Sequence, residues 1–212
     1  GILIDKQAME YEDYNIRGAS GKTTVLTYDE GDNFVSARTV ANKTFDLRGR
    51  VLTQEITNYT DEAMTAISDI QMIDNSDYTR YDYARHMSIR TYTQAGELVD
   101  RQEIDNTYDI YGNAQSQVIN RYDEFDRLID HKTVMNTYDS ALASRKGNAT
   151  HTTIRRYSSL TESVDYLIER QEISNTSFDE KGNILEQTLD RYTVDDGVEL
   201  LAASEVIRNL LI

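Results

Sequence analysis

RQEIDNTYDIYGN, at Arg101–Asn113, is written again later in the chain with one residue inserted, as RQEISNTSFDEKGN at Arg170–Asn183. Each version joins a run of polar and β-branched residues to an Asp-x-x-Gly tetrapeptide. Internal repeats have to be recognised before anything else, because a chain of similar units folds by stacking neighbours on one another. The first step is therefore to define the repeated unit.

The repeat extends well beyond this pair. GELVDRQEIDNTYD at Gly96–Asp109 aligns with DRLIDHKTVMNTYD at Asp126–Asp139 at an offset of 30 residues without a gap, and copies with one insertion lie at Asp165–Asp179 and Asp32–Asp46. A second, looser type of segment lies between them, such as GNAQSQVINRYD at Gly112–Asp123. Aromatic residues mark both types, and the ten intervals from residue 28 to residue 192 span 164 residues, a mean of about 16.

The unit is too short for helices and rich in the residues that favour strands. Two helices with their loops do not fit comfortably in 30 residues, and β-branched and aromatic side chains dominate the runs. Asp109 and Gly112 stand at the first and fourth positions of a type I turn, where Asp caps the turn and Gly adopts a left-handed conformation. Asp46–Gly49 and Asp179–Gly182 repeat this pattern. We predict an all-β array of antiparallel hairpins, about a dozen strands in sequential order, with little helix.

Alternation along the strands bears on how the sheet packs. Leu98, Ile104 and Tyr108 fall on one face together with polar residues, and the opposite face is polar throughout most of its length. Neither face is cleanly apolar, so we expect a curled open sheet, or part of a shell, in place of a two-layer sandwich. We treat residues 1–212 as one repeat array. Its ends fall inside the repeat register, which predicts a fragment of a longer repeat protein.

Recurrent residues receive structural roles in turns, strand ladders and aromatic stacking. The Asn of each copy is expected to bond backbone at a strand end or a like Asn in a neighbouring repeat, and a ladder of Asn side chains that reads a ligand is the alternative. The assigned positions are Tyr28, Asp29, Phe45, Asp46, Gly49, Tyr108, Asp109, Gly112, Tyr122, Asp123, Tyr138, Asp139, Phe178, Asp179, Gly182, Asn42, Asn106, Asn136 and Asn175.

Composition limits the classes of partner. The 212 residues hold 37 acidic and 22 basic side chains, a net charge of −15, which repels nucleic acid and anionic membrane surfaces. Absence of Cys excludes disulfides and thiolate metal sites, and absence of Pro suits a chain whose N–H groups enter strand ladders. No apolar run approaches the ~20 residues of a spanning helix, so we expect no membrane insertion.

The turn motif resembles the YD-repeat, or Rhs, family. The matching stretches are YDIYGN, FDLRGR and FDEKGN, with Asp in place of Gly in YDEFDR, and the resemblance covers roughly residues 21–197. It implies a spiralling antiparallel strip that closes into a hollow shell, as in toxin cocoons, adhesins and cell-surface scaffolds. The chain departs from the pattern in YDEGDN, whose Gly is shifted, in the insertion YDSALASRKGN, and over residues 60–80, which keep almost none of the motif.

Candidate chemical sites are few. GASGKTT at Gly18–Thr24 lacks the first Gly of a phosphate loop and leads into a strand, which favours a flexible turn. His86, His131 and His151 lie in different repeat copies without metal-ligand spacing, and each is interpreted as an ordinary strand residue. The acidic clusters at Asp29–Asn33 and Asp123–Arg127 leave Ca²⁺ open as a cofactor, although neither matches a known calcium loop. Otherwise no cofactor is expected.

Every recurring residue thus has a structural explanation. The sequence predicts a non-enzymatic structural and interaction module of a large secreted or cell-surface protein: a scaffold, an adhesin or a segment of a toxin-enclosing shell. Its expected partners are neighbouring repeats of the same polypeptide, and protein cargo or glycan. The alternative is a sheet that binds carbohydrate or another ligand through exposed tyrosines. A hydrolase would need a local departure from the repeat, for which residues 60–80 and 140–165 are the candidates.

Overall fold

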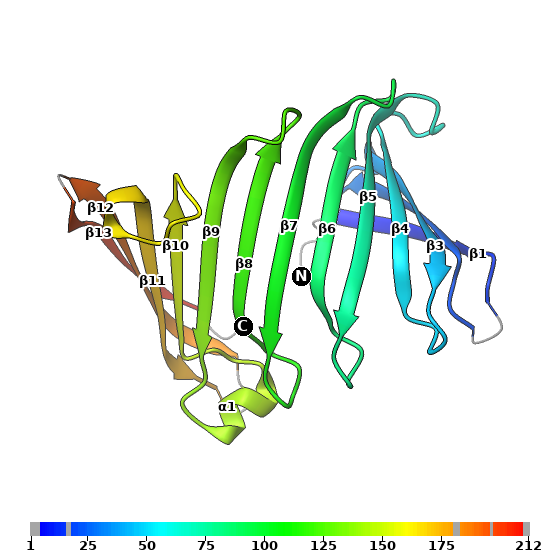
Figure 1. Cartoon of the computed structure of the whole chain (residues 1–212). Helices are drawn as coiled ribbons and strands as arrows, with labels where there is room; N and C mark the ends of the chain where they lie inside the picture. Colours follow the sequence, from blue (N-terminus) through cyan, green and yellow to red (C-terminus); the bar gives the residue numbers. More distant parts are fainter. Residues whose placement is uncertain (1–4, 16–17, 180–182, 196, 210–212) are drawn as a thin grey trace. The chain divides into compact units, whose positions relative to one another are not determined.

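A computed structural model describes residues 5–15, 18–179, 183–195 and 197–209 (Figure 1). These described residues form thirteen strands, which confirms the predicted all-β class. They are β1 (Asp5–Glu12), β2 (Lys22–Asp29), β3 (Phe34–Phe45), β4 (Val51–Tyr59), β5 (Ile67–Tyr78), β6 (Ala84–Tyr92), β7 (Leu98–Tyr108), β8 (Ala114–Asp123), β9 (Leu128–Thr137), β10 (His151–Tyr157), β11 (Leu167–Phe178), β12 (Ile184–Asp195) and β13 (Val198–Arg208).

The strands follow one another in the sheet in sequence order, β1 to β13. The chain divides into two compact units: Gly1–Tyr78 with His86–Gln102, and Thr79–Arg85 with Glu103–Ile212. Within the first unit β1 to β5 pair in succession, and within the second β8 to β13 do the same, each pair antiparallel. Sequential antiparallel pairing confirms the hairpin arrangement that the closely spaced turns predict.

One kind of turn recurs between strands. The N–H of Gly49 donates to the carbonyl of Asp46, and the N–H of Asp46 donates to the carbonyl of Arg50. Gly49 has φ +84°, so the loop is a type I turn followed by a left-handed residue. The same pair of backbone bonds closes the loops that begin at Asp29, Thr79, Thr93, Asp109 and Asp123. Thr79 and Thr93 use side-chain hydroxyls where the other loops use carboxylates.

The apparent departures from the motif keep the turn. In YDEGDN the left-handed residue is Asp32, with φ +58°, and not the shifted Gly31. In YDEFDR it is Asp126, with φ +65°. Residues 60–80, which seem to lack the motif, form a turn at Asp61 followed by the twelve-residue strand β5. Short polar Asp side chains tolerate this backbone region better than most, which lets the hairpins continue without Gly.

Bulges occur at a regular place in the strands. The register shifts immediately before Tyr28, Tyr59, Tyr122, Tyr157 and Tyr192, at the ends of β2, β4, β8, β10 and β12. In each case one residue near the start of the next strand is skipped, and it is apolar at Val35, Ile129 and Ile168. These three side chains are exposed. A bulge bends and twists its strand locally, so β3, β5, β9, β11 and β13 each start with a bend.

The insertion in YDSALASRKGN forms the short helix α1 (Ala141–Lys146). Ser140 accepts the N–H of Ala143 with its side chain, and Gly147 closes the helix at φ +71°. A single 3-10 turn, η1 (Val164–Tyr166), precedes β11. None of the described helices is long and apolar enough to cross a membrane.

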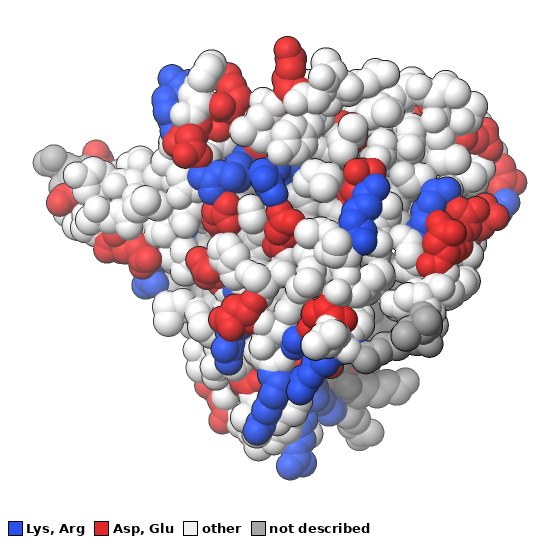
Figure 2. Space-filling model, turned by 45° about the vertical axis from the view of Figure 1, so that its right-hand side comes forward, with Lys and Arg blue, Asp and Glu red and all other residues white. Residues whose placement is uncertain are grey.

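The buried core is thin. Among the described residues four apolar side chains are buried, Val25, Ala37, Tyr157 and Leu167. Five polar ones are buried as well, including Asn106, His131 and Thr133. Acidic and basic side chains are interspersed over the face of the molecule that Figure 2 shows. Backbone ladders, turn bonds and side-chain contacts between adjacent strands therefore carry a larger share of the stability than in a domain with a central core.

Candidate functional site

The recurrent Asp residues are engaged in their own turns. One oxygen of Asp46 accepts the N–H groups of Arg48 (2.8 Å) and Arg50 (2.9 Å), and the other accepts Nε of Arg50 (2.6 Å). Asp29 and Asp123 accept turn N–H groups in the same way. At Asp179 the N–H of Asn183 donates to the side chain at 2.7 Å. Gly182 lies outside the described residues.

These bonds hold the carboxylates in the charged form. The side chain of Arg50 is the largest cause that lowers the pKa of Asp46 from 3.8 to about 2. At Asp109, burial works against the charge, but hydrogen bonds from Ser144, Asn113 and the turn backbone outweigh it and bring the pKa to about 2. A carboxylate with so low a pKa is a poor proton donor or acceptor near neutral pH. The repeated Asp residues are therefore turn caps.

Asp139 behaves differently. Its N–H donates to Oγ1 of Thr150 at 3.2 Å, and the chain then enters α1. The expected Tyr-Asp turn is absent at this place because the inserted residues form a helix capped by Ser140. In this copy the side chain of Ser140 accepts a backbone N–H group after the strand, as the Asp side chain does in the other copies.

The recurrent Asn residues bond backbone. Nδ2 of Asn42, Asn136 and Asn175 donates to the carbonyls of Ser20 (2.8 Å), Ala114 (2.9 Å) and Ala149 (2.8 Å), each at the start of the preceding strand. On the next strand, Gln54 donates to Oδ1 of Asn42, Gln117 to Oδ1 of Asn106, and Thr152 to Oδ1 of Asn136. Asn42 and Asn136 each tie three consecutive strands, which leaves those two amides little capacity to read a ligand, whereas the buried Oδ1 of Asn175 has no partner among the described residues.

The aromatic residues divide by position. Tyr108 donates its hydroxyl to the carbonyl of Ala84 at 2.9 Å and stacks on Tyr83 with ring centres 5.2 Å apart, and Tyr138 donates to the carbonyl of Ala114 at 3.3 Å. Burial raises the pKa of Tyr108 and Tyr138. Tyr28 donates to Glu62 at 2.7 Å. Phe45, Tyr122 and Phe178 are partly buried near strand ends. The hydroxyls of Tyr28, Tyr108 and Tyr138 thus bond residues of other strands or turns.

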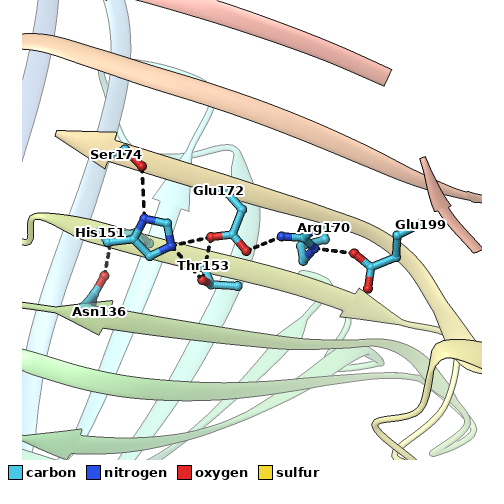
Figure 3. A network of polar contacts seen from close by, with 8 residues as sticks. Asn136, His151, Thr153, Arg170, Glu172, Ser174 and Glu199 are labelled. Atoms are coloured by element: carbon cyan, nitrogen blue, oxygen red, sulfur yellow. Dashed lines mark hydrogen bonds and ion pairs between the residues drawn. The ribbon is translucent and has the colours of Figure 1, made fainter. Parts of the chain in front are cut away.

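A polar network crosses β10, β11 and β13 (Figure 3). Nε2 of His151 lies 2.5 Å from Oε2 of Glu172, and its Nδ1 lies 3.1 Å from Oγ of Ser174. Thr153 donates to the same carboxylate at 2.8 Å. The network continues through Arg170, which contacts Oε1 of Glu172 at 2.5 Å and also Glu199. His151 faces Ser174 and Thr153 faces Glu172 in the strand register, which brings the groups onto one face.

The charges in this network stabilise one another. Burial opposes the charged form of Glu172, but hydrogen bonds from Thr153 and Arg170, together with the charge of His151, outweigh it and lower the pKa of that carboxyl. Burial opposes the charged form of Arg170, but the hydrogen bonds that it donates to Glu199 and Glu172 outweigh burial and raise its pKa, and its guanidinium lies 3.8 Å from the centre of the Tyr192 ring. Each charged group has an opposite partner within the network.

The network contains a hydroxyl, an imidazole and a carboxylate in contact, the set that nucleophilic catalysis uses. Acyl transfer also needs N–H donors aimed at the developing oxyanion. Ser174 pairs with His151 on one side and Thr188 on the other, so the backbone around it belongs to two strand ladders. The geometry suits a cross-strand polar ladder. The repeated Arg-Gln-Glu could have indicated it, since residues two apart share a strand face.

The other candidates from the sequence lie apart from this network. His131 is 3% exposed, with Nδ1 2.5 Å from Oδ1 of Asn120 and its ring beside Tyr157. It is a buried residue, which the strand pattern alone did not indicate. His86 lies in β6. In the GASGKTT stretch, Lys22 starts β2 and pairs with Glu12 at 2.7 Å, so the predicted turn and strand are present and no helix follows.

Within the described part of the chain, no three His, Asp or Glu side chains converge as a metal site would require. The first Asp of each acidic cluster, Asp29 and Asp123, is occupied by N–H donors of its own turn. Surface grooves are present. One of them, of 510 Å³, is lined by Arg80, Tyr81 and Gln115 among others, a set that the sequence pattern did not single out.

Comparison with known proteins does not assign the chain to a family. No protein-family model matches the chain, and no curated protein matches it. Among solved structures, it is similar to a crystal structure of a porin-like protein from Bacteroides uniformis, with 10% identity and a TM-score of 0.37, over 99% of this chain and 98% of that one.

Proposed function

We propose that this chain is a non-enzymatic structural and interaction module, made of β-hairpin repeats, from a large secreted or cell-surface protein. One observation carries the proposal: the recurrent polar side chains are engaged by bonds that repeat from hairpin to hairpin. Asp46 and Asp109 cap equivalent turns, and Asn42 and Asn136 bond equivalent carbonyls. Polar side chains whose hydrogen bonds are made within the array suit a structural scaffold.

The thin core supports the same function. Each strand pairs with the next along the chain, so units can be added without redesigning a shared interior. Such an array suits a long scaffold, an adhesin or the wall of a shell around a protein cargo, in keeping with the resemblance of its turns to YD repeats. The mixed surface charge and the −15 net charge keep a large array soluble.

Removal of one double unit tests the proposal. Deletion of residues 96–125 joins Ala95 to Asp126, so Asp126 takes over the left-handed turn position of Gly96. Both residues occupy equivalent places in their loops. We expect the shortened chain to keep its far-UV circular dichroism and a cooperative thermal transition.

A matched control removes residues 96–110, about one strand and turn. This deletion reverses the direction of every later strand, so we expect it to prevent folding. If the double-unit deletion is as disordered as the control, the strands do not form interchangeable units and the proposal fails.

A second function, binding of carbohydrate or another ligand, is favoured by the exposed tyrosines. Tyr81, Tyr111 and Tyr166 are 46%, 40% and 44% exposed. Exposed rings offer flat apolar surfaces beside polar groups. A glycan array probed with the 212-residue chain tests this function, and a lack of saturable binding to any glycan would leave the structural role alone.

A further inference from the structure

A groove at the start of the second compact unit is a candidate ligand site. Its 510 Å³ fall within the range of about 300–1,000 Å³ that small-molecule sites occupy. The residues on which the argument rests are Arg80, Tyr81, Tyr108, Asp109, Ile110 and Gln115. They come from the turn before β6, the end of β7 with its turn, and the start of β8. Each of them lies within the second unit.

Arg80 carries an unneutralised charge. Its guanidinium contacts the hydroxyl of Tyr81 and lies 4.5 Å from the centre of that ring, and it forms no ion pair with any described carboxylate. Arg50, Arg127 and Arg170, which also lie over aromatic rings, each have a carboxylate partner. Arg145, over the ring of Tyr111, resembles Arg80 in forming no ion pair with the described residues. Arg80 is therefore free to bind an anionic group in two-point contact.

The walls beside Arg80 are apolar and held in place. The Tyr81 ring is 46% exposed and Ile110 is 65% exposed. The backbone under Tyr81 is fixed because Oγ1 of Thr79 accepts its N–H at 3.3 Å and that of Tyr83 at 3.1 Å. Tyr108, stacked on Tyr83, forms a further wall. The groove thus exists before a ligand enters, which lowers the entropic cost of binding.

The polar side chains that line the groove limit which functional groups a ligand can present to it. The side chain of Gln115 is exposed and forms no hydrogen bond with the described residues, so its donors and acceptor are available. Asp109 is not available, because its oxygens already accept from the N–H groups of Tyr111 and Asn113 and from the side chains of Asn113 and Ser144. The ligand must supply an anion for Arg80, hydroxyls for Gln115 and an apolar face for Tyr81 and Ile110.

We propose that this groove binds a short saccharide carrying one or two carboxylates, such as a uronic acid unit. Its carboxylate lies against Arg80, the C–H face of its ring against Tyr81, and a hydroxyl against Gln115. The net charge of −15 repels long polyanions, so a short ligand with few charges is favoured over a highly charged polymer. The inference rests on the ligand-binding function proposed second above and names its site and ligand class.

Isothermal titration of the 212-residue chain with digalacturonic acid tests the site, with the neutral disaccharide galactobiose as the uncharged comparison. We expect saturable binding of digalacturonic acid with a Kd below about 1 mM. Arg80→Gln and Tyr81→Ala should each weaken it about tenfold or more. The matched control is Arg127→Gln, because Arg127 also lies over an aromatic ring in a turn but is paired with Asp123. It should leave the affinity unchanged.

Three results would overturn the proposal: no saturable binding of digalacturonic acid, equal affinity for galactobiose, or the same loss of affinity in Arg127→Gln as in Arg80→Gln. These results are distinct from failure of ligand binding in general. A glycan that binds the chain with an affinity insensitive to Arg80→Gln would keep the broader function and place its site elsewhere.

Discussion

The residue at the left-handed position of each turn is the smallest unit on which this fold depends. It is Gly at residues 49, 96 and 112, and Asp at residues 32, 82 and 126. The glycines themselves differ in their surroundings. A β-carbon at Gly112 would collide with the ring of Tyr83, whereas at Gly96 nothing lies within 4 Å. Gly112 is therefore required for two reasons, conformation and space.

Substitution by Ala at the two glycines separates these reasons. Gly96→Ala should lower the free energy of unfolding by about 1 kcal/mol, the cost of a left-handed conformation for a residue with a β-carbon. Gly112→Ala should cost more, since the Tyr83 ring must also move away from its stack on Tyr108. Urea unfolding of both variants measures the difference. Equal losses would mean that Tyr83 yields freely.

Acid should weaken the turns through their capping carboxylates. The pKa of Asp46 is lowered from 3.8 to about 2 in the folded chain, chiefly by the side chain of Arg50. A depressed folded-state pKa contributes stability above the unfolded value, and that stability is lost as the pH falls through the folded value. We expect the melting temperature of Asp46→Asn to lie below that of wild type at pH 7, and the gap to narrow between pH 4 and pH 2. A gap independent of pH would contradict the assignment.

At the scale of elements, alternate strands carry different recurrent residues. β3, β9 and β11 carry the Asn that reaches back to the start of the preceding strand, and the strands before them end in the Tyr that follows a bulge. The 30-residue repeat is therefore a pair of unlike strands. This explains why the looser strand type in the sequence shares so few residues with the first.

Asn136 and Tyr138 offer a direct measurement of this tie. Both donate to the carbonyl of Ala114, at 2.9 Å and 3.3 Å. Asn136→Ala or Tyr138→Phe alone leaves that carbonyl with one of the two donors, so each should cost about 1 kcal/mol or less. The double variant removes both donors and should cost more than the sum. A double-mutant cycle by chemical denaturation gives the coupling, and strict additivity would argue against a shared acceptor.

At the scale of the whole molecule, stability should vary along the chain. Neighbouring contacts dominate an array, so each strand is as stable as its own interfaces. In the second unit, β9 contains the buried His131 and Thr133, whereas every described side chain of β13 except Ala203 is exposed. We expect hydrogen exchange measured by mass spectrometry to be slow in β8 and β9 and fast in β13. Equal protection that is lost in one cooperative step would contradict the array.

Much of this architecture could be predicted from the sequence because its determinants are local. The turns depend on an Asp and on the residue three positions later, and the strands depend on short runs of β-branched and aromatic residues. Fold class, strand order and strand spacing therefore follow from near neighbours. The turns at Asp29 and Asp123 look irregular in sequence only because Asp can replace Gly at the left-handed position.

The tertiary structure decided what depends on residues far apart in the chain. The skipped residues Val35, Ile129 and Ile168 follow from the pairing register, which a strand pattern with period two does not contain. Contact between His151 and Ser174 requires β10 to align with β11. Burial of His131 depends on Tyr157, in the strand that pairs with its own. That Arg80 forms no ion pair with the described carboxylates is known only once the side chains have been placed in space. A sequence gives the number of charges but not which of them form pairs.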